Sequence, residues 1–223
     1  QINRQITNTV KLRHGENLQR FFANTIRMND LYKNKNVSPM LISTNSVAFD
    51  DPKYAFELEL DGERCIAYLD PKQGTELRNK RNVNMLLKLP ELAGLHKHVK
   101  TRCVLDGELI IPRKGKSDFS LLQRRSRMSN TFKIALAAKV HPASFWAFDI
   151  LYYKNSSVTG YPLTTRKKML FEATASVSPR FTVSRHVDTI GTALFEAVKY
   201  RDLQGVIGKR KGSLYYPGTR TDD

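Results

Sequence analysis

The feature that most constrains the fold of this 223-residue chain is a set of short β-prone segments that end at, or contain, an Asp-Gly pair. Apolar and polar residues alternate from Tyr54 to Leu60, and the run ends at Asp61-Gly62. This pattern is typical of a tight β-turn, so Cys65 to Leu69 is predicted to return as the partner strand of a hairpin. A second pair, Asp106-Gly107, interrupts the strand predicted over Val104 to Ile111. These segments predict antiparallel sheet.

Further strands alternate with helices along the rest of the chain. Strands are predicted over Ser144–Tyr153, Phe181–His186 and Gly205–Lys209, where β-branched and aromatic residues gather. Helical spacing of apolar residues predicts helices over Thr165–Ala175, behind a threonine cap, and over Thr189–Tyr200. Hairpins mixed irregularly with helices predict an α+β fold of mainly antiparallel sheets flanked by helices, not a doubly wound parallel sheet.

The first 37 residues are predicted to form a basic, helical segment ahead of the main domain. In the stretch 17–33 the apolar residues recur on one helical face, and the Asn/Lys-rich stretch 33–36 ends it. Ser38-Pro39 then begins a new segment, so the main domain is predicted over residues 38–223.

The charge balance predicts a polyanionic partner. Lys and Arg number 37 against 21 Asp and Glu, which gives a net charge of +16. The basic residues cluster at Arg124–Arg127, Arg166–Lys168, Lys209–Lys211 and 97–102, which favours nucleic acid over a generally basic surface. A membrane is not predicted as a partner, because no apolar run approaches 18 residues. Two cysteines and a polar amino terminus predict reduced thiols and an intracellular protein, cytoplasmic (nucleoid-associated) or nuclear.

Residues 57–64 read Glu-Leu-Glu-Leu-Asp-Gly-Glu-Arg. They resemble the Lys-x-Asp-Gly-x-Arg motif of the covalent nucleotidyltransferases, which include ATP-dependent DNA ligases, RNA ligases and mRNA capping enzymes. Glu59, Asp61, Gly62 and Arg64 fill the motif, and Glu59 stands where the family has its nucleophilic lysine.

Three further segments resemble later motifs of the ATP-dependent DNA ligases, in the family's order. They are Leu105–Leu109, Phe145–Tyr152 and Leu203–Arg210. Alone, each has a simpler interpretation as a turn, a core strand or a solvated surface, but four such motifs in the right order favour the family. The resemblance covers about residues 38–223 and implies an ATP-grasp-like nucleotidyltransferase (adenylation) domain.

The resemblance also implies roles for individual residues. Arg64 would contact the ribose or the nick phosphate, Glu108 the ribose hydroxyl or a metal, and Phe148 would stack on adenine. The remaining residues are assigned to binding ATP or AMP: Glu57 with its backbone at the base edge, Leu60 in the pocket, Lys209 at the phosphate and, from a degenerate motif, Arg78. A Mg²⁺ or Mn²⁺ ion is implied at Glu108 and Gln204.

Two residues depart from the family's pattern. Glu59 replaces the lysine that accepts AMP, and a carboxylate there repels phosphate. Gln204 replaces a metal-binding glutamate and loses the charge that favours a hard cation. The chain also stops before the lysine motif and the OB-fold domain that the family would add. Two hypotheses fit: a truncated and mutated active ligase, or a degenerate homologue kept as a binding module.

The function that the resemblance implies is ATP-dependent sealing of nicked duplex DNA through enzyme-AMP and DNA-adenylate intermediates, by a monomer. Because of Glu59, this chain is expected to be inactive in self-adenylation. The alternatives are a catalytically degenerate DNA- or nucleotide-binding module, and an RNA ligase or capping-type nucleotidyltransferase.

Overall fold

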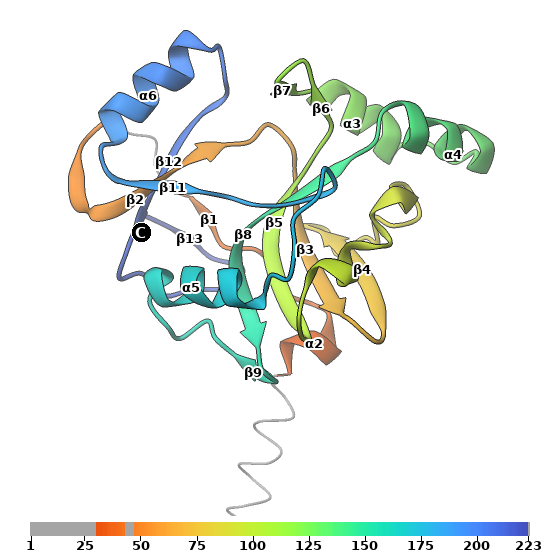
Figure 1. Cartoon of the computed structure of the whole chain (residues 1–223), viewed down its shortest axis with the longest axis horizontal. Helices are drawn as coiled ribbons and strands as arrows, with labels where there is room; N and C mark the ends of the chain where they lie inside the picture. The colour runs from red at the N-terminus through yellow and green to blue at the C-terminus, as the bar shows by residue number, and fades with distance from the viewer. Residues whose placement is uncertain (1–29, 43–46, 223) are drawn as a thin grey trace, which may run out of the picture.

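Two β-sheets carry the architecture of the computed structural model, which describes residues 30–42 and 47–222 (Figure 1). The larger sheet has six strands in the order β10-β8-β5-β3-β4, with β9 paired to β8. All its pairs are antiparallel except β8 with β10. Its strands are β3 (Glu63–Asp70), β4 (Gly74–Asn79), β5 (Cys103–Ile110), β8 (Ser144–Tyr153), β9 (Ser156–Ser157) and β10 (Phe181–Val183).

A smaller, three-stranded antiparallel sheet has the order β11-β2-β12. Its strands are β2 (Asp51–Glu59), β11 (His186–Thr189) and β12 (Gly205–Arg210). Two short pairs complete the described strands, one parallel and one antiparallel: β1 (Leu41–Ile42) with β13 (Arg220–Thr221), and β6 (Pro112–Arg113) with β7 (Lys116–Ser117).

Helices flank the sheets, as Figure 1 shows. The described helices are α2 (Leu31–Asn34), α3 (Phe119–Ser126), α4 (Thr131–Val140), α5 (Leu163–Ala173) and α6 (Gly191–Tyr200), with 3-10 turns η1 (Pro90–Leu92) and η2 (Leu95–His98). Helix α5 packs on β8, and α6 packs on β2 and β12. The α+β prediction of mainly antiparallel sheets with flanking helices is confirmed. None of the helices in residues 30–42 and 47–222 is long and apolar enough to cross a membrane.

The main hydrophobic core lies against the six-stranded sheet. Cys65, Leu105 and Phe145 contribute to it from three neighbouring strands, and each is fully buried. Both cysteines are free and buried, in agreement with the prediction of structural thiols. Helix α5 begins two residues before the predicted start, with Pro162 as its N-cap and no threonine side-chain cap.

The predicted hairpin between the segments around Asp61-Gly62 is wrong. Strand β2 pairs with β11 and β12, whereas β3 pairs with β4 and β5, so the chain passes from one sheet to the other at this point. A Cβ on Gly62 would lie 2.2 Å from the Leu109 carbonyl oxygen. Glycine is needed at this position because the backbone approaches β5 so closely. The burial of strands in two different sheets outweighs the preference of Asp-Gly for a hairpin turn.

The second Asp-Gly pair was predicted to interrupt a strand, and it does not. Asp106 and Gly107 lie inside β5, at a register shift of the β5–β8 pair. A Cβ on Gly107 would lie 2.4 Å from the Trp146 carbonyl oxygen, so glycine lets the two backbones approach at this bulge.

The predicted helix over 17–33 lies mostly outside the described residues. The described end of the amino-terminal segment, from Asp30, packs on the six-stranded sheet. Tyr32 is buried and its ring lies 6.3 Å from those of Tyr68 and Tyr152. The backbone N–H of Val37 donates to the Tyr68 hydroxyl at 3.2 Å. The predicted boundary at residue 37 stays a prediction.

Candidate functional site

A cavity of about 350 Å³ lies between the two sheets. The β2–β12 side, the β3–β5–β8 side and the carboxy-terminal segment all contribute residues to its lining. Nine of the predicted site residues line it: Glu57, Glu59, Leu60, Asp61, Arg64, Glu108, Phe148, Gln204 and Lys209. The four sequence motifs, far apart along the chain, therefore meet around one cavity of a size typical for small-molecule binding.

Arg78 is the one predicted site residue that does not line the cavity. Its side chain donates to Glu76 Oε1 at 2.7 Å and to the Asn82 carbonyl oxygen at 2.9 Å. These contacts hold it along β4 and the turn that follows, so the structure does not bring Arg78 to the site.

The strand β2 presents Glu57 and Glu59 on the cavity side, because alternate residues of a strand share a face. Phe56 points to the other side, where its ring lies 5.2 Å from that of Phe49. Glu59 pairs with Gly205 across β2 and β12. A Cβ on Gly205 would lie 2.5 Å from Glu59 Oε2, so the carboxylate occupies the space that a side chain would need.

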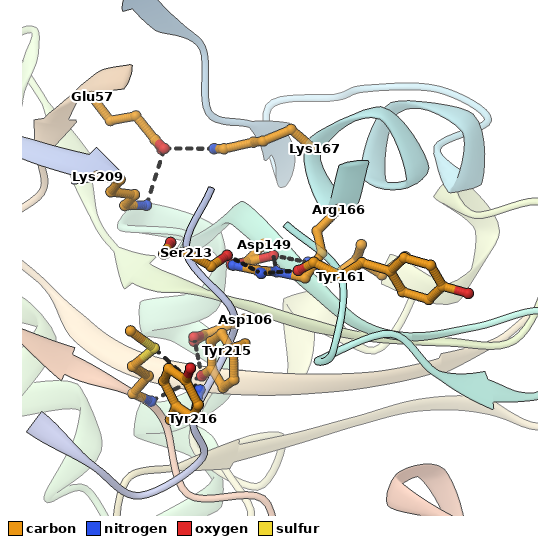
Figure 2. Close-up of polar contacts among 12 residues, drawn as sticks. Glu57, Asp106, Asp149, Tyr161, Arg166, Lys167, Lys209, Ser213, Tyr215 and Tyr216 are labelled. Atoms are coloured by element: carbon orange, nitrogen blue, oxygen red, sulfur yellow. Dashed lines mark hydrogen bonds and ion pairs between the residues drawn. The ribbon is translucent and has the colours of Figure 1, made fainter. Parts of the chain in front are cut away.

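Glu57 forms a buried cluster with two lysines (Figure 2). Its Oε1 lies 2.6 Å from Lys167 Nζ and 3.0 Å from Lys209 Nζ. Burial raises the pKa of Glu57, but the two ammonium groups outweigh burial and hold it below its usual value. Burial and the neighbouring Lys209 lower the pKa of Lys167 to about 8, against the opposing effect of Glu57.

The Phe148 ring is contacted by two cations. Lys209 Nζ lies 4.3 Å and Arg64 Cζ 4.5 Å from the ring centroid. Both are cation–π contacts, which favour a positive charge over the face of an aromatic ring. The ring and both cations line the cavity, so a base that stacks on Phe148 competes with these contacts.

On the six-stranded sheet, Arg64 is fixed by Asp106. Its Nε and one terminal nitrogen donate to the two Asp106 oxygens at 2.7 Å each, and the terminal nitrogen also donates to the Met40 carbonyl oxygen. The Tyr215 hydroxyl donates to Asp106 at 2.5 Å and accepts from the Met40 N–H at 2.9 Å. Asp106 raises the pKa of Arg64 against the opposing effect of burial.

A second buried pair joins β8 to α5 (Figure 2). The Arg166 guanidinium donates to both oxygens of Asp149, at 2.9 Å each. Its remaining terminal nitrogen donates to the carbonyl oxygens of Tyr161 and Ser213, at 2.6 and 2.9 Å. Asp149 follows Phe148 directly, so this pair holds the strand that carries the aromatic ring.

Two carboxyl groups that line the cavity, Glu108 and Glu59, have raised pKa values. Burial, with the nearby charges of Asp106, Glu63 and Glu59, raises the pKa of Glu108 to about 8, although Arg64 opposes the shift. Burial and the charge of Asp61 raise the pKa of Glu59. Glu108 and Glu59 therefore bind a proton at a higher pH than an exposed glutamate does.

Sequence reasoning missed the residues that hold the site together. Asp106 was assigned to a turn, Asp149 was only part of a motif, and Tyr215 was not singled out. Arg166 and Lys167 were counted as surface charge. One signal was present: a carboxylate beside an aromatic residue inside an apolar strand, as at Asp149, needs a buried partner.

The predicted basic clusters are partly structural. Arg125 is fully buried and pairs with Glu91, and it donates to the His141 carbonyl oxygen at 2.8 Å. Arg166 and Lys167 are buried in the contacts described above. The clusters therefore offer fewer free charges to a polyanion than their sequence indicates.

Comparison with known proteins agrees with the geometry. Residues 39–223 match the family model of the ATP dependent DNA ligase domain. DNA ligase C2 of Mycolicibacterium smegmatis is 33% identical over 187 residues, which cover 82% of this chain and 52% of that protein. The SPbeta prophage-derived DNA ligase-like protein LigB of Bacillus subtilis is 30% identical over 180 residues, covering 80% of this chain and 62% of that protein.

A solved structure of mycobacterial DNA ligase D complexed with ATP and MES has a TM-score of 0.68 and 29% identity, covering 84% of this chain and 58% of that one. This chain spans about half the length of the first two curated relatives it matches, 52% in each case. The motifs, the fold and the family model agree, and the chain belongs to the ATP-dependent DNA ligase domain family.

Proposed function

We propose that the cavity binds ATP and that the domain is the nucleotidyl-transfer part of an enzyme that seals nicks in duplex DNA. The observation that carries the proposal is the meeting of Glu57, Arg64, Glu108, Phe148 and Lys209 around one cavity. Phe148 supplies a stacking surface for adenine. Arg64 and Lys209, which lie beside the ring, supply N–H donors for the ribose and positive charge for the phosphates.

In the proposed reaction, an enzyme nucleophile attacks the α-phosphate of ATP and pyrophosphate leaves. AMP then passes to the 5′-phosphate at the nick, and the 3′-hydroxyl attacks that phosphate and releases AMP. Lys209 neutralises phosphate charge, and Arg64, held by Asp106, contacts the ribose or the nick phosphate. Positioned cations of this kind stabilise charge that develops during phosphoryl transfer.

This chain is proposed to lack the first step, because Glu59 replaces the amine nucleophile. A carboxylate close to the α-phosphate repels it by roughly 1–4 kcal/mol at an effective dielectric of about 80 to 20. The second candidate is therefore a nucleotide- and DNA-binding module without chemistry. In the described part of the chain, Lys209 is the one lysine that lines the cavity, and its ammonium group is held by Glu57. This contact favours the second candidate.

The predicted metal ligands do not form a metal site by themselves. Within the described residues no group of three His, Cys, Asp or Glu side chains gathers around a common point. Of the two predicted ligands Gln204 carries no charge, so Glu108 alone could supply the carboxylate that a hard cation prefers. No step of the proposal runs through a metal bound to these two residues.

Covalent labelling tests the proposal. The unmodified chain, Glu59→Lys and Glu59→Gln are incubated with Mg²⁺ and with ATP labelled at the α-phosphate, and are separated by denaturing electrophoresis. We expect label on Glu59→Lys, at least in trace, and none on the unmodified chain or on Glu59→Gln, which removes the charge without adding an amine. Label retained by the unmodified chain would contradict the assignment of position 59. Competition with adenosine or GTP then separates ATP recognition from that of a capping-type enzyme.

The DNA partner is tested by binding at several salt concentrations. We expect binding of the monomeric chain to nicked duplex with little sequence preference. If about five phosphates are contacted, log K falls with log salt at a slope of roughly −4 to −5. A slope near zero in fluorescence anisotropy would argue against a phosphate-dominated interface.

A further inference from the structure

We infer that Lys167 is a positioning residue: it holds the Glu57 carboxylate permanently, so that Lys209 can exchange between Glu57 and a nucleotide phosphate. The inference deepens the proposed function and rests on nucleotide binding in the cavity. Lys167 belongs to none of the sequence motifs, and it does not line the cavity.

The two lysines contact the same carboxylate oxygen from different surroundings. Lys167 Nζ lies 2.6 Å from Glu57 Oε1, and the side chain of Lys167 is 4% exposed. Lys209 Nζ lies 3.0 Å from the same oxygen, but its side chain is 19% exposed and lines the cavity. Figure 2 shows both ammonium groups converging on this oxygen. Lys209 can therefore reach a ligand in the cavity, and Lys167 cannot.

The charge count makes one lysine dispensable to Glu57. The cluster holds one carboxylate and two ammonium groups, and Glu57 is 2% exposed. A carboxylate buried to this extent needs a counter-ion, because desolvation is not otherwise compensated. If Lys209 leaves, Lys167 still neutralises Glu57. If Lys167 is removed, Lys209 becomes the remaining partner and is retained.

The other nearby acid, Asp149, does not compete with Glu57 for the Lys167 ammonium group. Asp149, which acts electrostatically on Lys167, is already paired with Arg166 through two hydrogen bonds. Lys209 is one of the charges that lower the pKa of Lys167. When Lys209 moves towards a phosphate, it therefore favours the charged form of Lys167 and strengthens the remaining ion pair.

The second contact of Lys209 makes its release depend on the ligand. Its Nζ lies 4.3 Å from the centroid of Phe148. A base stacking on this ring replaces the cation–π contact, and the phosphates offer Lys209 another anion. Adenine and phosphate thus act together to draw Lys209 away from Glu57, while Lys167 keeps the carboxylate in place.

Calorimetry with adenosine and ATP tests this role on the full chain and its Lys167→Met variant. In Lys167→Met, Lys209 is retained by Glu57 and does not reach the phosphates. The affinity for ATP should therefore fall at least about tenfold more than the affinity for adenosine, as expected for losing one charged contact to a phosphate. Lys167→Arg, which keeps the charge, should restore the ratio of the two affinities to within about twofold. The matched control is Lys168→Met, a change at an exposed neighbour on the same helix.

A second variant separates positioning from a loss of packing. Glu57→Gln combined with Lys167→Met removes both charges, so Lys209 is free again and the ATP-to-adenosine ratio should recover. Thermal unfolding of each variant checks that it folds. Equal weakening of ATP and adenosine in Lys167→Met, or no recovery in the double variant, would overturn this inference alone. If the unmodified chain binds neither ligand, the proposed function falls as well.

Discussion

The two walls of the cavity hold their charges differently. On the six-stranded sheet, Asp106 and Asp149 each accept two hydrogen bonds from one arginine, and each arginine also donates to a backbone carbonyl. On the three-stranded sheet, one oxygen of Glu57 is shared by two flexible lysines. Bidentate arginine pairs fix geometry, whereas a lysine is a point charge on a mobile stem.

Both residues that are predicted to depart from the family's pattern lie on the second wall. Glu59 is on β2 and pairs with Gly205, and Gln204 is the residue before it. The arginine-carboxylate wall retains the matched Arg64 and Phe148. The comparison therefore separates a wall whose charges are fixed by arginine pairs from a wall that carries the two proposed departures.

The largest expected effect is on the rigid wall. Arg166→Met leaves the buried Asp149 carboxylate without its counter-ion, with the Ile150 N–H still donating to it, and should lower the free energy of unfolding by about 3–5 kcal/mol. The control is Arg113→Met, which breaks the exposed pair with Asp118 and should cost at most about 1 kcal/mol. Urea unfolding measures both. Similar small losses in the two variants would show that the wall is not held as the contacts indicate.

The next effect is on the changed wall. Glu59→Lys removes a charge that repels phosphate, which by itself should strengthen ATP relative to adenosine by roughly 1–4 kcal/mol, and the added ammonium group acts in the same direction. Calorimetry with adenosine and with an ATP analogue that has a methylene bridge between its α- and β-phosphates, and so cannot transfer AMP to the new lysine, measures the difference. Glu196→Lys makes the same charge change on the exposed face of α6 and should leave the ratio unchanged. An equal gain in both variants would show that the effect comes from the net charge of the chain and not from position 59.

Phe148 tests the base-binding surface between the walls. Phe148→Ala should weaken adenosine by about 1–3 kcal/mol, the usual range for loss of base stacking on an aromatic ring. Phe171→Ala, at an exposed position on α5, is the matched control. If adenosine binds Phe148→Ala as well as it binds the unmodified chain, the ring is not the adenine platform.

The last effect is the pH dependence of stability due to Glu108. Its pKa is about 8 in the folded chain, mainly because of burial, against a usual value of 4.5. The folded state therefore binds more protons between these values, and this contribution to stability is lost as the pH rises towards about 8. The slope is at most about 1.4 kcal/mol per pH unit. Glu108→Gln should flatten it in urea titrations from pH 5 to pH 8, and an unchanged slope would assign it elsewhere.

Several features of the fold were predictable because they depend on neighbours in sequence. The strand Ser144–Tyr153 was predicted with the bounds that it has. Helix α6, Gly191–Tyr200, differs from its prediction only at its start. Aromatic enrichment and helical periodicity are local signals, and the core did not override them.

The Asp-Gly pairs show where local signals fail. Both were assigned to turns, but one carries the chain between sheets and the other lies within β5. The preference of Asp-Gly for turns is smaller than the gain from burying strands in two sheets. The glycines are required by close backbone approach, which depends on strands distant in sequence.

The sequence by itself determined the family, the mixed α+β class and the order of the motifs, because these follow from residue identity and local spacing. Only the tertiary structure decided which charges are partners. Arg166 and Lys167 are adjacent in sequence and belong to one basic run, yet one fixes Asp149 and the other holds Glu57. The physical reason is that burial makes a charge find a partner wherever the packed strands supply one, and sequence spacing does not encode that distance.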